Sequence, residues 1–569
     1  MKIKRIYIQN YKSIDNLDIT LNPKLNVFIG ENGMGKSNIF EAINWLLGPT
    51  YPTFNTVTKQ DHYLGDENNK ILIRLEFDSG ETLEFNEYRE IDGKSGLFYN
   101  EEKYNCRGKD REKFCSAYIG VERQIVDYLP SNKWSLLGRI LLDINKKFLE
   151  ERTENGEKKS EKLKKELDRV RDELLFSVKD DEGNEIMQKF IKILQEESAN
   201  QMNKRKEDFQ LNFNLYDPWN FYKTLQILVN EPDIGLIFQA SQLGMGAQAS
   251  ITIAILRAYS EIKIGVGNPI FIDEPDLFLH PQAQRSLYKI LRKLADERNI
   301  QIFYITHSPY LLSLEYFDEI FVVRKTKENG TYIRNGEIDK FIEDLKIRER
   351  IDTDRELLKL HYKNAFEQTA DSIFSLEAFF AKKVILVEGE SEALILPYFF
   401  EKIDFDYIKE KITIVKCGSK NELDRFFRLY SEFGIPCFVI FDGDKDKINE
   451  DEHKKINNEL FDILKETESE EFPDSKVHEK YLGFEYDFNY ALKEAGFKNV
   501  YNESSHNKSP KGLKLFLKVK SQSNVDFPQW IKEIKKRIIN LSEEVRSVLK
   551  TEVSDEEEFN YIEEEDLPF

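Results

Sequence analysis

The chain has little cysteine and no long apolar run. Its 569 residues include four cysteines, none of them in a CxxC pair, and so sparse a set excludes a disulfide framework and a zinc ribbon. We expect these residues to be buried free thiols. No apolar stretch approaches the roughly 20 residues that a membrane span needs, and the first residues lack the apolar core of a signal peptide. The sequence therefore predicts a cytoplasmic globular protein with several domains.

Positive charge is also in short supply. The net charge is -20, from 83 Lys and Arg against 103 Asp and Glu, and an acidic chain is on its face a poor ligand for nucleic acid. Much of the acid lies in the C-terminal tail or in helical runs, whereas lysines gather between Lys508 and Lys520. Any contact with DNA is therefore expected to be local, sensitive to salt and assisted by divalent cations.

A glycine-rich loop follows the last of the predicted N-terminal strands. The strand over 25–29 leads into the sequence G-x-x-x-x-G-K-S, and a helix is predicted from Asn38 to Leu47. Glycines let backbone N–H groups approach phosphates, a lysine supplies charge to the terminal phosphates, and a serine hydroxyl binds Mg²⁺. The pattern predicts an ATP site with these candidate contacts: Gly30, Asn32, Gly33, Gly35, Lys36, Ser37 and Asn38.

Two later strands end in the polar groups that such a site needs. The apolar strand over 268–272 leads to Asp273 and Glu274, which we assign to holding Mg²⁺ and to orienting the attacking water. The apolar strand over 301–305 leads to His307. A lone histidine is usually a surface or core residue, but at this position we expect it to contact the γ-phosphate.

A second glycine turn, over 242–250, precedes a predicted helix from Ile251 to Ile262. In ATPases of the ABC, SMC and RecF kind, such a turn binds the γ-phosphate held by the opposite subunit through backbone amides at a helix N-terminus. The candidate contacts here are Gly244, Gly246 and Gln248, and their role implies a dimer. An ordinary loop remains the alternative.

The segment between these motifs is predicted to be helical. Residues 140–210 are highly charged, and leucines and valines recur there at steps of three and four residues. The segment is too short for the long coiled coil of SMC proteins. A dimerisation element and a solvated helical hairpin are both open interpretations.

Acidic residues recur at strand ends further along the chain. The strand over 382–387 stops at Glu388, a glycine turn and a helix carrying Glu392 follow, and the strand over 437–441 stops at Asp442 and Asp444. Strands that alternate with helices predict a parallel sheet, in which ligands bind at the carboxyl ends of the strands. Close carboxylates repel by about 4 kcal/mol per pair at a separation near 4 Å and an effective dielectric near 20. We therefore expect a bound cation.

The expected cation is a hard one. Oxygen ligands without histidine or cysteine select Mg²⁺, Mn²⁺ or Ca²⁺ over zinc, and this many carboxylates could hold two ions, as in-line cleavage of a phosphodiester requires. Glu485 and Asp487 could complete the site, and Lys511, beside Gly512, is our candidate for a catalytic lysine. A surface acidic patch is the alternative.

The order and spacing of these motifs resemble the OLD family of nucleases, named for overcoming lysogenisation defect, and in particular the nuclease subunits of Gabija antiphage systems. The resemblance covers essentially the whole chain. It implies cleavage or nicking of DNA, a homodimer or a higher assembly such as a tetramer, and, in Gabija systems, a separate helicase partner. It assigns metal binding to Glu388, Glu392, Asp442 and Asp444, with Glu485 or Asp487 joining them, and assistance in the chemistry to Lys511.

The chain departs from that family pattern at two positions. Asn489 stands where the E-x-D-x-E stretch usually ends in an acid, which weakens the second metal site. Asp273 stands where relatives often carry glutamate, a change that an Mg²⁺ site should tolerate.

The expected fold is α/β, with an ABC/SMC/RecF-like P-loop ATPase head, a helical insertion and a Toprim domain. The predicted boundaries are 1–139 and 211–375 for the two parts of the ATPase domain, 140–210 for the insertion, and 376–569 for the Toprim nuclease domain with a C-terminal helical extension. We expect ATP to gate the Toprim site. The alternative function is an SMC- or RecF-like DNA-clamping ATPase in DNA repair, with an inactive or structural Toprim domain.

Overall fold

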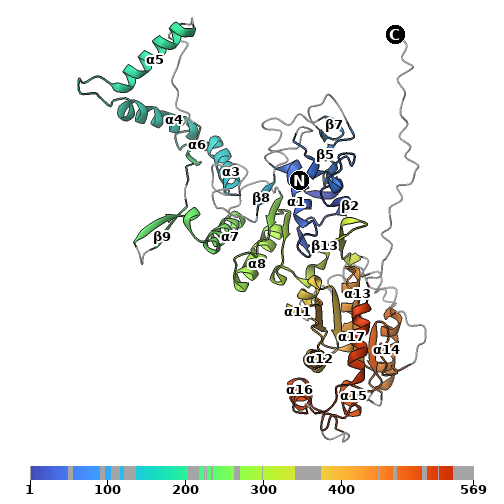
Figure 1. Ribbon diagram of the computed structural model, residues 1–569. Coiled ribbons are helices and arrows are strands. Elements are labelled where there is room, and N and C mark those ends of the chain that lie inside the picture. Colours follow the sequence, from blue (N-terminus) through green and yellow to red (C-terminus); the bar gives the residue numbers. More distant parts are fainter. Residues whose placement is uncertain are drawn as a thin grey trace, which may run out of the picture. The chain divides into compact units, whose positions relative to one another are not determined.

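A computed structural model describes most of the chain. The chain divides into two compact units. The first comprises Met1–Leu312 with Tyr316–Ile333, and the second Ser313–Glu315 with Arg334–Phe569 (Figure 1). The described residues are 2–48, 56–89, 96–103, 116–120, 136–202, 205, 217–222, 224–225, 227–231, 235–261, 269–297, 299–339, 342, 373–445, 447, 449–464, 471–502, 509–522 and 524–542.

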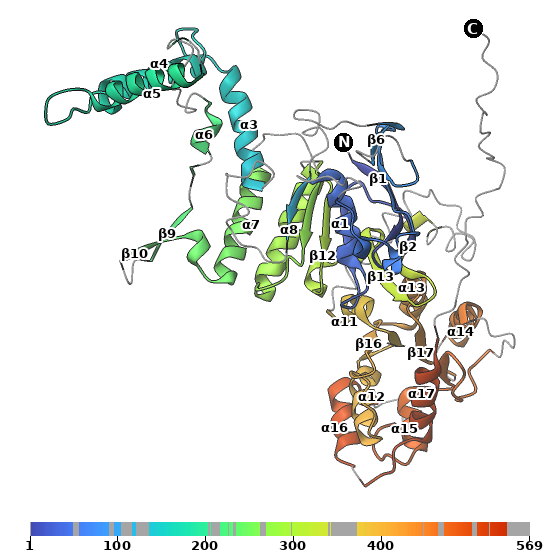
Figure 2. The ribbon, with the colours of Figure 1, turned by 45° about the horizontal axis from the view of Figure 1, so that its top comes forward.

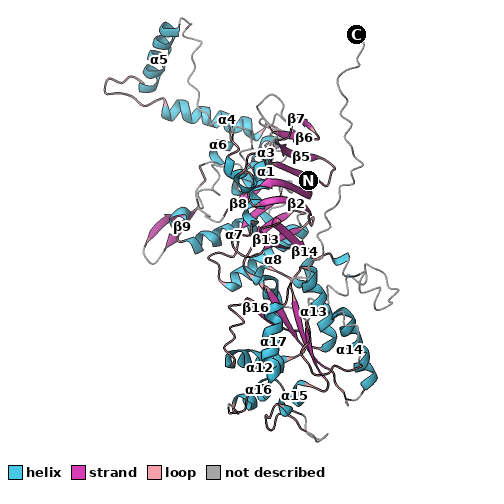
Figure 3. Ribbon diagram, turned by 45° about the vertical axis from the view of Figure 1, so that its right-hand side comes forward, coloured by secondary structure: helices cyan, strands magenta, loops and turns pink. Residues whose placement is uncertain are grey.

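The first unit is built on a mixed sheet, whose strands are magenta in Figure 3. Its strands are β1 (Ile3–Tyr11), β2 (Ile14–Thr20), β3 (Leu25–Ile29), β4 (Leu72–Phe77), β5 (Thr82–Asn86), β6 (Leu97–Tyr99), β7 (Glu102–Lys103), β8 (Ala117–Ile119), β11 (Ile270–Asp273), β12 (Ile302–Ile305), β13 (Ile320–Thr326) and β14 (Gly330–Asn335). The order of the 12 strands is β7-β6-β5-β4-β1-β2-β14-β13-β3-β12-β11-β8.

The strands that carry the predicted ATP motifs pair in parallel. β3 lies between β13 and β12, and β11 lies between β12 and β8, with every one of these pairs parallel. The carboxyl ends of β3, β11 and β12 therefore lie along one edge of the sheet. This register brings the glycine loop, Asp273 and His307 to the same edge, although they are far apart in the sequence.

Helices complete the first unit. Those that the structure describes are α1 (Lys36–Leu47), α3 (Leu136–Glu150), α4 (Lys159–Val170), α5 (Ile186–Met202), α6 (Trp219–Tyr222), α7 (Met245–Glu261) and α8 (Pro281–Glu297). The aromatic ring of Phe40 on α1 packs edge-on against Phe28 of β3 and Phe271 of β11, with ring centroids 5.3 and 5.5 Å apart. These buried contacts hold the N-terminus of α1 at the strand ends.

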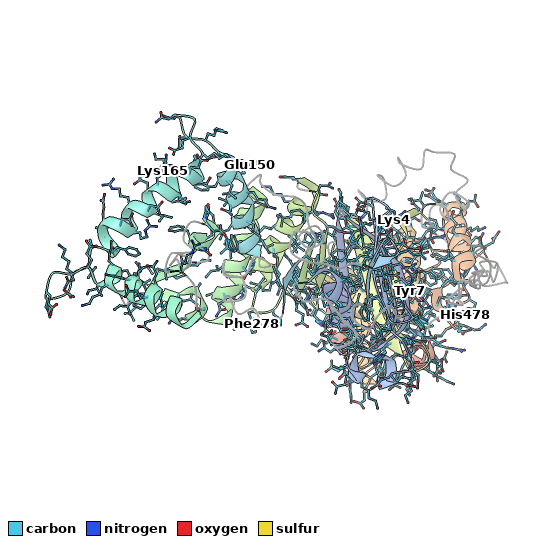
Figure 4. The ribbon with its side chains drawn as sticks, turned by 90° about the horizontal axis from the view of Figure 1, so that it is seen from above. Lys4, Tyr7, Glu150, Lys165, Phe278 and His478 are labelled. Carbon is cyan, nitrogen blue, oxygen red and sulfur yellow. The ribbon has the colours of Figure 1, made fainter. Side chains whose placement is uncertain are left out.

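The predicted helical segment contains α3, α4 and α5. Figure 4 shows Glu150 at the end of α3 and Lys165 on α4, with their side chains drawn as sticks. Ion pairs lie on the surface of this segment, such as that between Lys165 Nζ and Glu157 Oε1 at 2.5 Å. A two-stranded hairpin of β9 (Leu228–Glu231) and β10 (Leu236–Gln239) lies further along the chain.

The second unit contains a parallel sheet of four strands, β15 (Lys383–Val387), β16 (Ile412–Lys416), β17 (Cys437–Asp442) and β18 (Tyr481–Phe484), in the order β16-β15-β17-β18. The prediction of a parallel sheet is confirmed. Its described helices are α11 (Ile373–Glu377), α12 (Glu390–Lys402), α13 (Lys420–Glu432), α14 (Glu450–Leu464), α15 (Phe488–Glu494), α16 (Gly512–Lys520) and α17 (Gln529–Asn540). Helix α16 packs against α12 (Figure 2).

The described residues include two of the four cysteines, and their helices can be examined for membrane-spanning length. Cys417 and Cys437 are buried free thiols, and Cys106 and Cys115 lie outside the described residues. Across the described ranges, no helix combines the length and the apolar character that crossing a bilayer requires.

Candidate ATP and metal sites

The glycine loop has the backbone shape of a phosphate cradle. Gly33 and Gly35 have φ values of 79° and 99°, in the left-handed region that glycine enters at little cost. A Cβ at Gly35 would lie 2.3 Å from Thr331 Oγ1 and 2.6 Å from Ser13 Oγ, so the loop has no room for a larger residue there. Asn32 and Ser37 are exposed, and Asn38 donates a hydrogen bond to Ser13 Oγ at 2.7 Å.

Lys36 is buried in this loop. Its Nζ donates to the backbone carbonyl oxygens of Gly30 and Glu31 at 2.8 and 2.9 Å, and the residue is 5% exposed. Burial lowers its pKa, and the negative charges of Glu274 and Asp273 oppose that shift. Neutral carbonyl partners can be exchanged for phosphate oxygens, which are stronger acceptors for an ammonium group. The helix begins at Lys36, two residues before the predicted start.

Asp273 ends β11 as predicted and lies close to Glu274. Its Oδ1 is buried and finds no hydrogen-bond partner among the described residues, and Oδ2 accepts a long hydrogen bond of 3.4 Å from the Tyr118 hydroxyl. Desolvation, followed by the charge of Glu274, raises the pKa of Asp273 to about 6. An unsatisfied carboxylate oxygen at a strand end fits a cation ligand.

Glu274 and His307 face each other. His307 Nε2 lies 3.7 Å from Glu274 Oε1, and Glu274 has a φ of 48°, which is rare for a residue with a side chain. Desolvation and the charge of Lys36 lower the pKa of His307, so the neutral imidazole dominates at pH 7. The structure thus brings Lys36, Asp273, Glu274 and His307 to one edge of the sheet.

The second glycine turn differs from the expectation. Helix α7 begins at Met245, six residues before the predicted Ile251, so Gly246 and Gln248 lie in its first turn. Gln248 is buried, and its Nε2 donates to Leu243 O at 2.7 Å. Within one chain, the Gln248 amide therefore holds the turn together, while Gly244 has nothing within 4 Å of a Cβ built on it.

In the second unit, the four predicted acids lie at the ends of two adjacent strands and in the helix that follows one of them. Glu388 follows β15, Glu392 lies in the first turn of α12, Asp442 ends β17 and Asp444 comes two residues later. Desolvation raises the pKa of Glu388 to about 7, with the negative charge of Asp444 as the next cause. Desolvation and the charges of Glu388 and Glu392 raise the pKa of Asp442 well above its usual range. These carboxylates are close enough to repel one another.

Local donors bind some of these oxygens. Glu392 Oε2 accepts from Gly389 N at 3.0 Å, and Asp442 Oδ1 accepts from Phe488 N at 2.9 Å. Glu388 Oε2 is buried and finds no hydrogen-bond partner among the described residues. Burial is the largest cause of the raised pKa values of Glu388, Glu392 and Asp442, and the charges of Lys420 and Lys511 partly oppose it at Glu388 and Glu392.

Two lysines that the sequence reasoning missed bind Asp444. Lys420 Nζ lies 2.7 Å from Asp444 Oδ2, and Lys447 donates to Asp444 Oδ1. Lys420 and the hydrogen bonds from both lysines lower the pKa of Asp444 despite its burial. The signal in the sequence is Lys420 itself, which follows Gly418 and Ser419 after β16, at the same edge as the acids.

The remaining predicted residues take separate positions. Glu485 forms an ion pair with Lys445, with Nζ and Oε1 2.5 Å apart. Asp487 caps α15, its Oδ1 accepting from Tyr490 N at 2.8 Å. Lys511 is exposed at the N-terminus of α16, and its charge acts on the carboxyl of Glu392 by lowering that group's pKa against burial.

Asn489, which departs from the family pattern, stabilises the backbone of two later segments. Its buried amide donates to the carbonyl oxygens of Val500 and Pro510 at 2.8 and 2.9 Å. Pro510 directly precedes Lys511. The amide therefore fixes the backbone beside the predicted catalytic lysine, which a carboxylate, having no donor, could not do.

The donor set fits a hard divalent cation. Among the described residues, His, Cys, Asp and Glu side chains form no group of three or more already arranged around a metal position. The buried, unpartnered Glu388 Oε2 and the raised pKa values nevertheless identify a place where positive charge is missing. Carboxylate oxygens alone suit Mg²⁺, Mn²⁺ or Ca²⁺.

Comparison with known proteins places both units. Residues 1–116 and 99–312 match the AAA ATPase domain, and the chain belongs to this family. Residues 379–444 match the TOPRIM domain described as overcoming lysogenization defect protein-like. An AAA ATPase domain is thus joined to an OLD-like TOPRIM domain in one chain.

Two relatives align with this chain over most of their length. The chain is 26% identical over 483 residues to the OLD nuclease of Thermus scotoductus, covering 79% of this chain and 83% of the relative. It is 25% identical over 497 residues to the Old nuclease of Escherichia phage P2, covering 78% and 77%. Among solved structures, the SMC head domain from Thermotoga maritima is 18% identical, covers 59% of this chain and 100% of that chain, and has a TM-score of 0.30.

Proposed function

We propose that this protein is an ATP-regulated, divalent-metal-dependent endonuclease that nicks or cuts DNA. The observation that carries the proposal is the group of buried carboxylates beside the ends of β15 and β17 in the TOPRIM domain, Glu388, Glu392 and Asp442, with a buried Glu388 Oε2 that has no hydrogen-bond partner among the described residues. The ATPase domain in the same chain and the two relatives named as nucleases support it.

Glu388, Glu392 and Asp442 are the proposed ligands of Mg²⁺ or Mn²⁺, with Ca²⁺ as a further candidate. When bound, a divalent ion in such a site supplies a nucleophilic water and neutralises a phosphate oxygen. Lys511 faces the same charges from the N-terminus of α16 and stabilises the added negative charge of the transition state. Glu485 stays outside this set, because it already forms an ion pair with Lys445. Asp487 caps α15, but its charge acts on Glu392 and Asp442, so it is a further candidate ligand.

The head is the proposed regulatory ATP site. Lys36 exchanges its two carbonyl partners for phosphate oxygens, Ser37 and Asp273 hold Mg²⁺, and Glu274 orients the attacking water next to His307. Gly244 and Gly246, at the start of α7, face the γ-phosphate of a second chain. The proposed assembly is a homodimer or a larger even-numbered oligomer, and nucleotide controls access of DNA to the TOPRIM site.

In the cell, we place this nuclease in the cytoplasm and in antiphage defence, as the nuclease subunit of a Gabija-type pair with a helicase partner. The support is the resemblance of the motif order. A helicase-like reading frame beside the gene is the expected neighbour, and a solitary gene would instead indicate a stand-alone nuclease.

The test is cleavage of supercoiled plasmid in Mg²⁺ or Mn²⁺, with and without ATP. Glu388→Gln removes one proposed ligand and should lower the cleavage rate by at least about 100-fold. Glu401→Gln, an exposed glutamate at the other end of α12, is the matched control and should cleave like wild type. If wild type leaves plasmid intact under every nucleotide condition but retains it on DNA pull-down, the DNA-clamping ATPase is the better assignment.

A further inference from the structure

A buried ion pair lies beside the proposed metal ligands. Lys420 opens α13, and Asp444 follows the end of β17. Their side chains are only 5% and 6% exposed, with Nζ and Oδ2 2.7 Å apart. An ammonium group enclosed in this way has little freedom to move, because leaving its partner would strand two charges in a poorly solvated place.

A fully buried asparagine ties this pair to the backbone of the acidic turn. Lys420 Nζ also donates to Asn457 Oδ1 at 3.2 Å. The amide of Asn457 donates in turn to Gly443 O at 3.0 Å and to Glu471 O at 3.2 Å. Gly443 stands between Asp442 and Asp444. The lysine therefore helps set where both carboxylates of the turn lie.

Both oxygens of Asp444 are already engaged by basic groups. Lys447 donates to Oδ1, and Lys420 Nζ lies 2.7 Å from Oδ2. His453 Nδ1 lies 3.3 Å from Oδ2 but makes no hydrogen bond within the described part of the chain. The contrast is with Glu388, whose Oε2 is buried without a hydrogen-bond partner among the described residues. Within this acidic cluster, Asp444 makes direct contacts with two ammonium groups, whereas Lys420 acts on Glu388 and Lys511 on Glu392 through their charge.

We propose that Lys420 is a resident cation in the place where a second divalent ion would otherwise bind, and that Asp444 is a positioning residue and not a metal ligand. The TOPRIM site then takes one divalent ion, at Glu388, Glu392 and Asp442. The physical reason is exclusion, because a second dication near Asp444 would have to displace a buried ammonium that the fold holds from two sides. This inference rests on the proposed metal site but not on cleavage.

The experiment counts Mn²⁺ ions on the full-length protein without nucleotide or DNA, by isothermal titration and by the electron paramagnetic resonance signal of free Mn²⁺. Wild type should bind one tight ion per chain. Asp444→Asn should also bind one ion, with an affinity within about threefold of wild type. Two tight ions on wild type, or a loss of affinity of tenfold or more in Asp444→Asn, would overturn the proposal.

Two lysine variants sharpen the count. Lys420→Met leaves Asp444 without its buried partner and should raise the number of tight Mn²⁺ ions from one to two. Lys447→Met removes the more exposed lysine on the same carboxylate and should leave the count at one. If Lys420→Met does not fold, Asp444→Asn alone decides the question. A protein that binds one Mn²⁺ as expected but cuts no DNA contradicts the nuclease proposal and leaves this one standing.

Discussion

Each of the two sites contains a buried lysine, and the two lysines are bound in opposite ways. Lys36 and Lys420 are both 5% exposed. Lys36 is held by the neutral carbonyl oxygens of Gly30 and Glu31, whereas Lys420 is held by the carboxylate of Asp444. Burial alone therefore does not tell what a lysine does. A lysine on neutral acceptors is available to an incoming anion, and a lysine on a carboxylate is already neutralised.

The largest expected effect comes from Lys36→Met. The variant should weaken ATP binding by at least about 100-fold, because a charge-assisted contact to the phosphates disappears from a buried site. Binding of a fluorescent ATP analogue measures this, with Lys4→Met on the exposed side of β1 as the control. Affinity within threefold of wild type would show that the two buried lysines are not functionally different.

The next effect is on stability. Lys420→Met should destabilise the second unit by about 3 kcal/mol without metal, because it removes the buried partner of the Asp444 carboxylate and leaves only the more exposed Lys447. The same change at Lys447, whose side chain is 46% exposed, should cost less than about 1 kcal/mol. Urea titration followed by hydrogen exchange in peptides from β17 and α14 measures both. Equal losses for the two variants would contradict the structural role of Lys420.

A smaller effect depends on pH. Glu388 has a pKa of about 7 in the folded protein against an ordinary 4.5, so between these values the folded state binds more protons than the unfolded state. Stability of the metal-free protein should therefore fall as the pH rises from 4.5 to 7 and level off above it. Melting curves of wild type and Glu388→Gln in EDTA should show a shallower decline in the variant, and Mg²⁺ should restore stability at pH 8. If the stability of the two proteins falls with pH at the same slope, the raised pKa of Glu388 is wrong.

The smallest expected effect is at Gln248. Because its amide bonds to Leu243 O within the chain, Gln248→Ala should cost the α7 turn about 1 kcal/mol and change the ATP affinity of a monomeric preparation less than about twofold. Equilibrium binding and thermal melting measure these quantities. A much larger loss of ATP affinity would indicate that the Gln248 side chain contacts the nucleotide. The second glycine turn would then bind nucleotide within one chain, as the first is proposed to do.

Much of the site could be read from sequence because its residues follow apolar strands. Asp273 and His307 in the first unit, and Glu388 and Asp442 in the second, each follow a run whose burial is evident from composition alone. Within each sheet, parallel pairing then brings these strand ends to the same edge. Helices α1 and α7 begin at Lys36 and Met245, earlier than the sequence pattern predicts, since glycine and polar residues in a first turn resemble a loop.

The sequence does not reveal which partners the polar groups contact. Lys420 pairs with Asp444, Asn489 holds Pro510, and Gln248 turns toward its own chain, and none of these contacts has a local signature. Each depends on how α13, α15 and α7 are set against neighbouring segments. A lysine in a charged helix is most often solvated, so only its burial reveals that Lys420 is different.

The sequence by itself determined the chemistry that this protein carries: a phosphate loop with its acidic and histidine companions, and carboxylates at the ends of strands that must pair in parallel. Tertiary structure alone decided which of those carboxylates remain uncompensated. The reason is that motifs are local and follow the chain, whereas charge balance in a buried site depends on side chains that meet only after the sheets and helices have packed.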